Sequence, residues 1–305
     1  MKMRKNLISP TRTVLHVVSH SPGGTNGHAT GIKSSTARTN ADLPAVFLEP
    51  AVNKAVRPCL RLILGDQLNP QHSWFRVIRP DVIYVLMEVR NETDYVLHHA
   101  QKVLGIFAAM RAMAQQLKSD GHRVRHIAIN DPSNRQDIIT NLEALIAHYG
   151  AISVEYQLPD EWRLDKALQE WSSSSHVKVT SVDSEHFLTQ RNEARNFFKG
   201  KKQWLMESFY RHQRRQHHIL LTAEGKPQGG QWNFDADNRK PWSGTPVEPP
   251  DTRPCHDHRE LWRIIASSGV KTMGESQAAA FRWPLNRSEA LTQLDHFIES
   301  GLPHF

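Results

Sequence analysis

The sequence predicts an α/β protein built on a doubly wound, parallel sheet of five strands. From Arg57 onward, short apolar runs alternate with segments that have helical period. The connections between successive runs are long enough to hold crossover helices, which parallel strands require. With 305 residues, of which 39% are hydrophobic, the chain can bury a sizeable core and is long enough for two domains.

Five segments are expected to form the strands of this sheet. The first is the run Cys59-Leu-Arg-Leu-Ile-Leu, which stops at Gly65, a residue that lets the backbone leave a buried strand sharply. The other four runs have the same short, apolar character. The predicted strands are residues 59–65, 82–88, 124–129, 152–158 and 177–182.

Four helices are predicted: three from the spacing of apolar residues and a glycine at their ends, and the one at residues 203–218 from its amphipathic pattern. The clearest begins near Val96, has apolar residues along one side as far as Leu117, and ends at Gly121. The others cover residues 133–148, 203–218 and 288–300. The last of them has an apolar stripe formed by Leu291, Leu294, Phe297 and Ile298.

The net charge of +7 is unevenly distributed: residues 1–56 contribute +5, residues 191–218 contribute +6, and the rest of the chain sums to −4. Residues 1–56 are rich in Ser, Thr, Gly, Asn and His and lack a sustained apolar period. We expect them to be a disordered tail or an extension from a start codon assigned too far upstream. Their composition also fits an organelle presequence, although no amphipathic arginine-rich helix is evident.

Several classes of protein are disfavoured by what the sequence lacks. No apolar stretch approaches the roughly 20 residues that cross a bilayer, and no secretory signal core is present, so a cytoplasmic protein without a membrane partner is expected. The two cysteines, Cys59 and Cys255, are far apart, which disfavours a disulfide framework. No glycine-rich phosphate-binding motif follows the first strand. The segment 255–258 crowds three ligand types together without a fourth, so we expect no metal site. The pairs His98-His99 and His217-His218 are expected to be helix-surface residues and not catalysts.

Acids, amides and aromatic residues follow the first four predicted strands. In an open parallel sheet these carboxyl ends are where ligands bind. Groups of this kind could hydrogen-bond to and stack on a flat heteroaromatic ligand, although loop residues are often polar without a function. The residues concerned are Asp66, Gln67, Glu88, Asn91, Glu92, Tyr95, Asn130, Asp131, Asp160, Glu161, Trp162 and Arg163.

The predicted helix at residues 203–218 has a cationic face. Helical geometry puts Arg211, Arg214 and Arg215 on one side, together with Glu207 and His218 and beside Trp204. Because Arg neutralises phosphates and aromatic rings stack on bases, we interpret this face as a nucleic-acid-binding surface. A solvated helix face with a Glu207–Arg211 pair is the simpler alternative.

These residues together resemble the bacterial iron-sulfur photolyase and cryptochrome family, the deoxyribodipyrimidine photolyase-related proteins. The resemblance is ordered along the chain and covers residues 57–305. It is carried by Leu64-Gly65-Asp66-Gln67-Leu68, Glu88-Val89, Tyr95-Val96, His98-His99, Glu161-Trp162-Arg163, Phe209-Tyr210-Arg211 with Arg214-Arg215, and Gly229-Gly230-Gln231-Trp232-Asn233-Phe234-Asp235-Ala236-Asp237-Asn238-Arg239.

The resemblance implies a Rossmann-like antenna domain at residues 57–190 and, at residues 191–305, a basic helix, a connector and the start of an incomplete helical FAD-binding domain. A lumazine-type antenna chromophore is implied in the first domain, surrounded by Gly65, Asp66, Glu92, Tyr95 and Ile106. The implied activity is light-driven electron transfer from reduced FAD to pyrimidine photoproducts in DNA. The resemblance assigns no catalytic residue to this chain.

The chain also departs from the family pattern. Family members continue for about another domain's length, which holds most of the FAD pocket and the four cysteines of an iron–sulfur cluster. We therefore expect this chain to be truncated and inactive alone, with a separate polypeptide as one possible source of the other half. The alternative is a non-enzymatic chromophore-binding or nucleic-acid-binding module. A weaker third hypothesis, an adenylyl-transferring enzyme, lacks its phosphate-binding signature.

Overall fold

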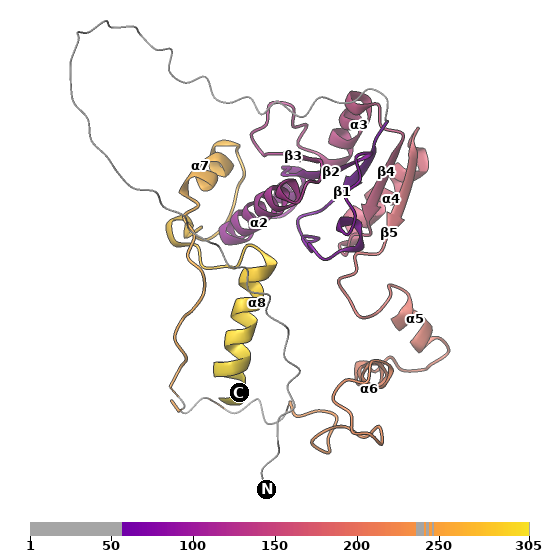
Figure 1. Ribbon diagram of the computed structural model, residues 1–305, viewed down its shortest axis with the longest axis vertical. Coiled ribbons are helices and arrows are strands. Elements are labelled where there is room, and N and C mark those ends of the chain that lie inside the picture. Colours follow the sequence, from indigo (N-terminus) through magenta and orange to yellow (C-terminus); the bar gives the residue numbers. More distant parts are fainter. Residues whose placement is uncertain (1–56, 236–240, 242–243, 246, 305) are drawn as a thin grey trace, which may run out of the picture. The chain divides into compact units, whose positions relative to one another are not determined.

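The structure is a computed structural model that describes residues 57–235, 241, 244–245 and 247–304 (Figure 1). The predictions for residues 1–56, and for the segments 236–240 and 242–243, lie outside the described residues. Within the described part, no helix combines the length and the apolar character that crossing a membrane requires.

Five strands form one sheet in the order β3-β2-β1-β4-β5, and every neighbouring pair is parallel. The predicted fold class is confirmed. Strand β1 lies in the middle of the sheet. Strands β2 and β3 extend the sheet to one edge, and β4 and β5 extend it to the other, so the strand order reverses between β1 and β4. The strands are β1 (Cys59–Leu62), β2 (Val82–Met87), β3 (Val124–Ile127), β4 (Ser153–Gln157) and β5 (Lys178–Val182).

Helices cover both faces of the sheet. On one face, α2 (Ala100–Ser119) packs against the strands and shares its core with α7 (Arg259–Ser267) and with Phe281. On the other face, α3 (Ile138–Tyr149) and α4 (Trp162–Ser174) complete a second core (Figure 1). Strand β2 is apolar on both sides, and β1 is apolar except for Arg61, which pairs with Glu155, because both faces of the sheet are buried.

The remaining elements are short or belong to the second half of the chain. They are η1 (Ser73–Phe75), α1 (Asn91–Asp94), α5 (Glu193–Phe198), α6 (Met206–Gln216), η3 (Ala278–Ala280), α8 (Arg287–His296), the π-helical turn η4 (Phe297–Gly301) and η5 (Leu302–His304). The apolar stripe of α8 and η4 is about half exposed within the described residues.

The helix predicted at residues 133–148 begins later than expected, at Ile138. Asn134 donates hydrogen bonds to the carbonyls of Glu88 and Ala128, which holds the preceding segment in a loop against the strand ends. Asp137 then caps the helix by accepting from the Thr140 amide at 2.8 Å. The end was predicted correctly: Gly150 closes α3 in the left-handed conformation, with φ of 59°.

Candidate ligand-binding pocket

A pocket of about 240 Å³ lies where the strand order reverses, at the carboxyl ends of β1, β2 and β4. This is the position at which open α/β sheets bind ligands. Segments far apart in the sequence meet there: the turn after β1, the α1 region after β2, one face of α2, and the start of α4. The pocket brings together all five residues expected around a ring, namely Gly65, Asp66, Glu92, Tyr95 and Ile106.

The walls of the pocket are mostly apolar and suit a flat ring system. A glycine is required at position 65 because the turn that follows β1 passes very close to α2. A Cβ atom at this position would lie 2.6 Å from Cγ2 of Ile106 and 3.3 Å from the sulfur of Met110. The apolar lining consists of Ile63, Leu64, Met87, Val89, Val103, Ile106, Phe107, Met110, Ile138, Pro159 and Leu164.

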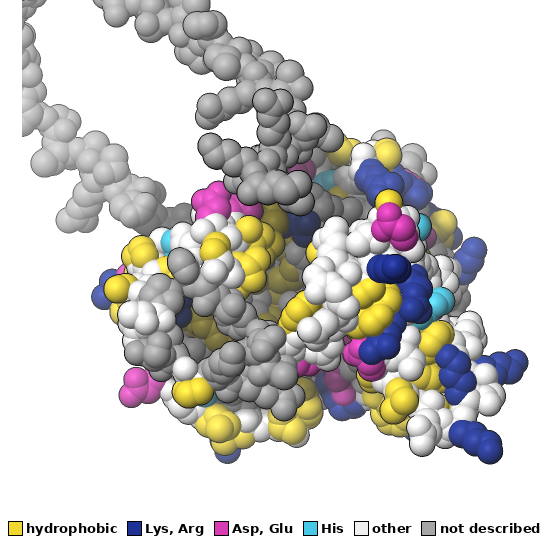
Figure 2. All heavy atoms as spheres, turned by 90° about the horizontal axis from the view of Figure 1, so that it is seen from below, with side chains coloured by type: hydrophobic (Ala, Val, Ile, Leu, Met, Phe, Trp, Pro, Cys, Tyr) yellow, Lys and Arg dark blue, Asp and Glu magenta, His cyan; other side chains and the backbone are white. Residues whose placement is uncertain are grey.

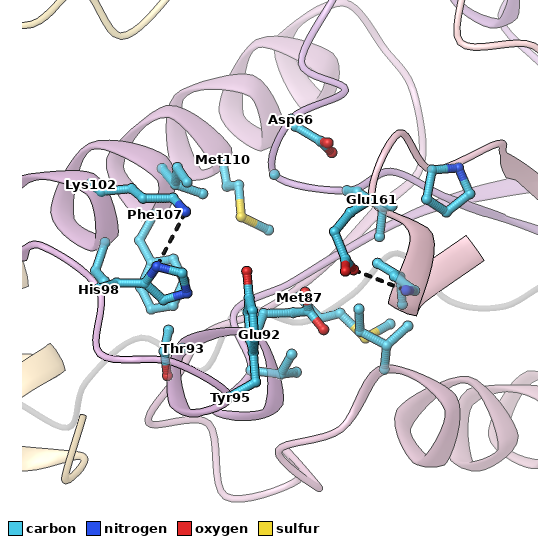
Figure 3. A pocket seen from close by; sticks show the side chains of 18 of the residues that line it. Asp66, Met87, Glu92, Thr93, Tyr95, His98, Lys102, Phe107, Met110 and Glu161 are labelled. Atoms are coloured by element: carbon cyan, nitrogen blue, oxygen red, sulfur yellow. Dashed lines mark hydrogen bonds between the residues drawn. The ribbon is translucent and has the colours of Figure 1, made fainter. Parts of the chain in front are cut away.

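Carboxyl groups occupy one end of the pocket, where Asp66 and Glu161 lie on the same side of the cavity (Figure 3). Glu161 is the N-cap of α4: its two oxygens accept from the amides of Arg163 and Leu164 at 3.0 and 2.9 Å. Burial raises the pKa of Asp66, and the nearby Asp160 adds to the effect. Ionised Asp66 is therefore less well stabilised than a fully hydrated carboxylate.

Glu92 presents an unused acceptor to the pocket. Its Oε2 accepts a hydrogen bond from Nη2 of Arg163 at 2.8 Å, whereas its Oε1 is buried and has no partner among the described residues. Burial raises the pKa of Glu92, against the opposing influence of Arg163. An unpaired buried oxygen is costly, so this atom is a ready acceptor for a donor on a ligand.

A basic pair, His98 and Lys102, occupies the opposite end of the pocket (Figure 3). Nζ of Lys102 lies 3.2 Å from Nδ1 of His98. Burial, followed by the charge of Lys102, lowers the pKa of His98, which favours a neutral imidazole that accepts from the ammonium group.

These two residues were missed by reading the strand ends. We expected His98 to be a helix-surface residue, but it is buried and lines the pocket. A sequence signal was present for Lys102: positions 102, 106 and 110 repeat every four residues, the spacing that places side chains on one face of a helix. His98 precedes α2 and its N-cap His99, so this signal does not extend to it.

Other strand-end residues do not line the pocket, so the expected convergence of four strand ends is wrong in part. Glu88 is completely buried and is held by Arg111, by His126 and by the Ile129 amide. Asp131 pairs with Arg125. For Asp131 the physical reason is that β3, which it follows, lies at the sheet edge, two strands away from β1. Glu88 follows β2, but its partners on α2 and β3 and at Ile129 hold it outside the pocket lining. The other residues outside the lining are Gln67, Asn91, Asn130, Asp160, Trp162 and Arg163.

The cationic helix α6 differs from expectation in one residue. Arg214 was predicted on the exposed face, but it is 6% exposed, and it donates to the carbonyls of Ile219 at 3.1 Å and Trp232 at 3.3 Å. The prediction is wrong because the chain after α6 folds back over this side. Arg211 and Arg215 instead flank the Trp232 ring, at 5.7 and 4.7 Å from its centroid.

The neighbouring surface combines cations with exposed aromatic residues. Trp204 is 76% exposed and stacks on Phe198 at a centroid distance of 6.0 Å. The ammonium group of Lys201 lies over the Phe197 ring at 3.1 Å. Figure 2 shows Lys and Arg side chains interspersed with hydrophobic ones on the right-hand side of the face that it draws.

Among the described residues, no group of three or more His, Cys, Asp or Glu side chains is arranged to hold a metal ion. In the segment 255–258, His256 is instead paired with Glu289 of α8 at 3.1 Å and stacked on His258. Of the two cysteines, Cys59 is buried in β1 and Cys255 is exposed.

Comparison with known proteins matches this chain to one described family and to a relative that is named as a photolyase. Residues 61–283 match the model of the family described as deoxyribodipyrimidine photo-lyase-related protein. A (6-4) photolyase from Agrobacterium fabrum is 36% identical over 250 residues, which are 81% of this chain and 48% of that protein. The chain thus spans about half the length of this relative. An uncharacterized protein of Acanthamoeba polyphaga mimivirus is 22% identical over 52% of this chain and 82% of its own length.

Among solved structures, the chain is similar to a bacterial class III photolyase from Agrobacterium tumefaciens. The sequence identity is 19%, the TM-score is 0.29, and the match covers 42% of this chain and 26% of the other. The fold class rests on the sheet topology described above.

Proposed function

This chain belongs to the deoxyribodipyrimidine photo-lyase-related family, and on that basis we propose that its pocket binds a lumazine-type antenna chromophore. We further propose that the chain takes part in light-driven, FAD-dependent repair of pyrimidine photoproducts in DNA. The antenna chromophore would supply absorbed light energy to the flavin.

The observation that carries the proposal is the chemistry of the pocket wall. A lumazine is a flat bicyclic ring with apolar faces and an imide N–H on its edge. The apolar lining suits the faces, and the buried, unpaired Oε1 of Glu92 suits the N–H donor. A volume of about 240 Å³ is small for a ligand pocket and favours a two-ring chromophore over a dinucleotide such as FAD.

The residues of this chain do not fit every cofactor of the family. An iron–sulfur cluster needs four thiolates, and the chain has only Cys59 and Cys255. We assign no FAD site to the described residues, so reduced FAD and the photoproduct belong to the activity proposed for the family as a whole. What this chain's residues contribute is binding and orientation of the antenna, with exclusion of water from its faces.

The test is a titration of the full chain with 6,7-dimethyl-8-ribityllumazine, followed by absorbance and fluorescence. Saturation at one equivalent is expected. Ile106→Phe should abolish it, because the added ring would fill the space beside Gly65. Ile152→Phe, at an exposed isoleucine outside the pocket lining, is the matched control and should bind normally. Absence of saturable binding, or equal binding by both variants, would overturn the assignment.

A second candidate function is nucleic-acid binding by the α6 surface. It is favoured by Arg211 and Arg215 beside Trp232, and by exposed Trp204 with Lys201 nearby. Such a surface could contact phosphates and stack on bases. This function would stand even if the chain were a binding module without enzymatic activity, and its test is given in the Discussion.

A further inference from the structure

Helix α8 is joined to the segment 251–258 by polar contacts. Nε2 of His256 lies 3.1 Å from Oε2 of Glu289, and Nε2 of Gln293 donates to the carbonyl of Thr252 at 2.8 Å. In the described part of the chain, none of the side chains of α8 is buried. The docking of α8 therefore depends on these polar contacts more than on burial of apolar surface.

His256 connects α8 to the core through a second histidine. Its ring is stacked on that of His258, with centroids 5.5 Å apart and an interplanar angle of 23°. The His258 ring in turn meets the Phe281 ring edge-on, at a centroid distance of 5.7 Å. Phe281 is 1% exposed and exchanges two backbone hydrogen bonds with His256, each at 2.9 Å. Contacts thus run from Glu289 on α8, through two imidazole rings, to a buried residue of the core that α2 covers.

His258 is poorly placed to carry a positive charge. Its Nε2 atom is buried and has no hydrogen-bond partner among the described residues. Burial lowers the pKa of His258, the charge of His256 adds to the effect, and the carboxylates of Asp257 and Glu289 oppose it. Both ring nitrogens of an imidazolium are donors, so protonation would leave a buried N–H without an acceptor.

We propose that the stacked pair His256–His258 is an acid-sensitive latch, which holds α8 in place while His258 is neutral and releases it when His258 is protonated. The docked and the released positions of α8 are the two states of this device. Because docking lowers the pKa of His258, its stabilising contribution is fully present above the ordinary pKa of 6.5. The contribution is lost as the pH falls from that value through the lower pKa of the docked state.

Release of α8 would change the accessibility of the turn that follows β1. A groove is lined on one side by this turn, at Gly65 and Asp66, and on the other side by the start of α8, at Leu285, Asn286 and Arg287. The latch residue Glu289 lies in the first turn of the same helix. The protonation of His258 is thereby coupled to the opening of this groove.

The experiment is hydrogen–deuterium exchange of the full chain at pH 7.5 and pH 5.5, with protection factors corrected for the intrinsic exchange rate at each pH. An undocked helix of 10 residues is marginal in water, so the α8 amides report its release. Peptides from α8 should lose about tenfold in protection at pH 5.5, which is the most that one histidine with a released-state pKa of 6.5 can supply over this range. Peptides from α3 should keep their protection.

His258→Phe keeps a ring between His256 and Phe281 but cannot be protonated, so protection of α8 should be the same at both pH values. His258→Gln is smaller and also uncharged, and it should give the same result with less demand on space. His148→Phe, at an exposed histidine on α3, is the control and should keep the tenfold loss.

Three outcomes would overturn the proposal, and none of them depends on chromophore binding. The first is protection of α8 that does not change with pH in the wild-type chain. The second is a tenfold loss that persists in both His258→Phe and His258→Gln, since another group would then be its source. The third is an equal loss in the peptides of α3, which would indicate general acid unfolding.

Discussion

The guanidinium carbon of Arg163 lies 4.3 Å from the centroid of the Tyr95 ring. The same guanidinium group donates to Glu92 at 2.8 Å and lies 3.4 Å from Glu161. Arg163 is in the first turn of α4, whereas Glu92 and Tyr95 belong to the segment that follows β2. One side chain behind the pocket lining therefore fixes three of the residues that form it.

Replacing Arg163 by Leu should weaken chromophore binding more than it weakens the fold. The ion pair is about one-third exposed, so its loss should cost no more than about 1 kcal/mol of unfolding free energy. Glu92 and Tyr95 would lose their orientation, and we expect the Kd of the ribityllumazine to rise about fivefold. Chemical denaturation and ligand titration measure the two effects.

Arg79→Leu is the control for this change, because Arg79 pairs with Asp81 on the surface, outside the pocket lining. It should leave the Kd unchanged. An unchanged Kd in Arg163→Leu as well would show that Glu92 and Tyr95 keep their positions without the guanidinium group.

Glu88→Gln should destabilise the protein in a pH-dependent manner. Burial alone would raise the pKa of Glu88, but hydrogen bonds from Arg111 and His126 outweigh it and hold the pKa below its ordinary value of 4.5. The carboxylate therefore stabilises the fold above about pH 4.5, and this contribution is lost as pH falls through the lower folded-state pKa. We expect a loss of about 2 kcal/mol at pH 7.

Denaturant unfolding of wild type and Glu88→Gln between pH 7 and pH 3 measures this effect. The difference between the two proteins should shrink on acidification. Glu170→Gln is the matched control, since Glu170 forms an exposed pair with Lys166 and should change stability by less than about 0.5 kcal/mol at any pH. A difference that is constant with pH would rule out the carboxylate charge as its source.

Local sequence patterns predicted the sheet and part of the pocket. The apolar run before Gly65 and the reversal rule for parallel sheets together placed Asp66 at a ligand-binding edge. Pocket residues on α2 and just before it were less accessible to this reasoning: Ile106 came only from the family resemblance, and His98 was read as a surface residue. The pocket wall is made when α2 packs across the strand ends, which depends on tertiary contacts.

Arg214 illustrates a second limit of prediction from local sequence patterns. A helical projection gives the face of a helix on which a side chain lies, but not what covers that face. Residues 219–232 return over α6 and supply the carbonyls that bury Arg214, and nothing in the local period of residues 203–218 indicates this. Its burial depends on contacts from outside the helix.

Gly274→Ala should destabilise the junction between the second half of the chain and α2. Gly274 has φ of +69°, and a Cβ atom there would overlap the imidazole of His99, the N-cap of α2. The adjacent Met273 exchanges backbone hydrogen bonds with His98 and Ala100, at 2.9 and 2.8 Å. We expect a loss of about 2 kcal/mol, in which the left-handed backbone accounts for about 1 kcal/mol.

Gly225→Ala separates the cost of the left-handed backbone from the cost of the overlap with His99. Gly225 has φ of +75°, and no atom lies within 4 Å of the position that its Cβ would take. Thermal unfolding should therefore show only the smaller backbone effect in this variant. Equal losses in the two variants would mean that the 270–274 segment moves away from His99 at little cost.

Arg214 and Arg215 are adjacent in sequence and should respond oppositely to substitution by Met. Arg214→Met removes the donors to the buried carbonyls of Ile219 and Trp232, and should lower stability by about 2 kcal/mol. Arg215 is exposed, so Arg215→Met should change stability by less than about 0.5 kcal/mol. Urea unfolding of the two variants measures this contrast.

Binding of a single-stranded oligonucleotide should depend instead on Arg215, which is exposed, and on Arg211, which is partly exposed and paired with Glu207 at 2.8 Å. If Arg211 and Arg215 each neutralise one phosphate, the double variant Arg211→Met/Arg215→Met should reduce the slope of log K against log salt by about 1.4. The exposed pair Lys166→Met and Lys178→Met, on α4 and β5, removes the same charge from another surface and serves as the control. A binding surface on α6 requires that the position of the cations matters as well as their number. An equal loss of slope in the control would therefore show that the effect comes from net charge alone and would contradict the prediction.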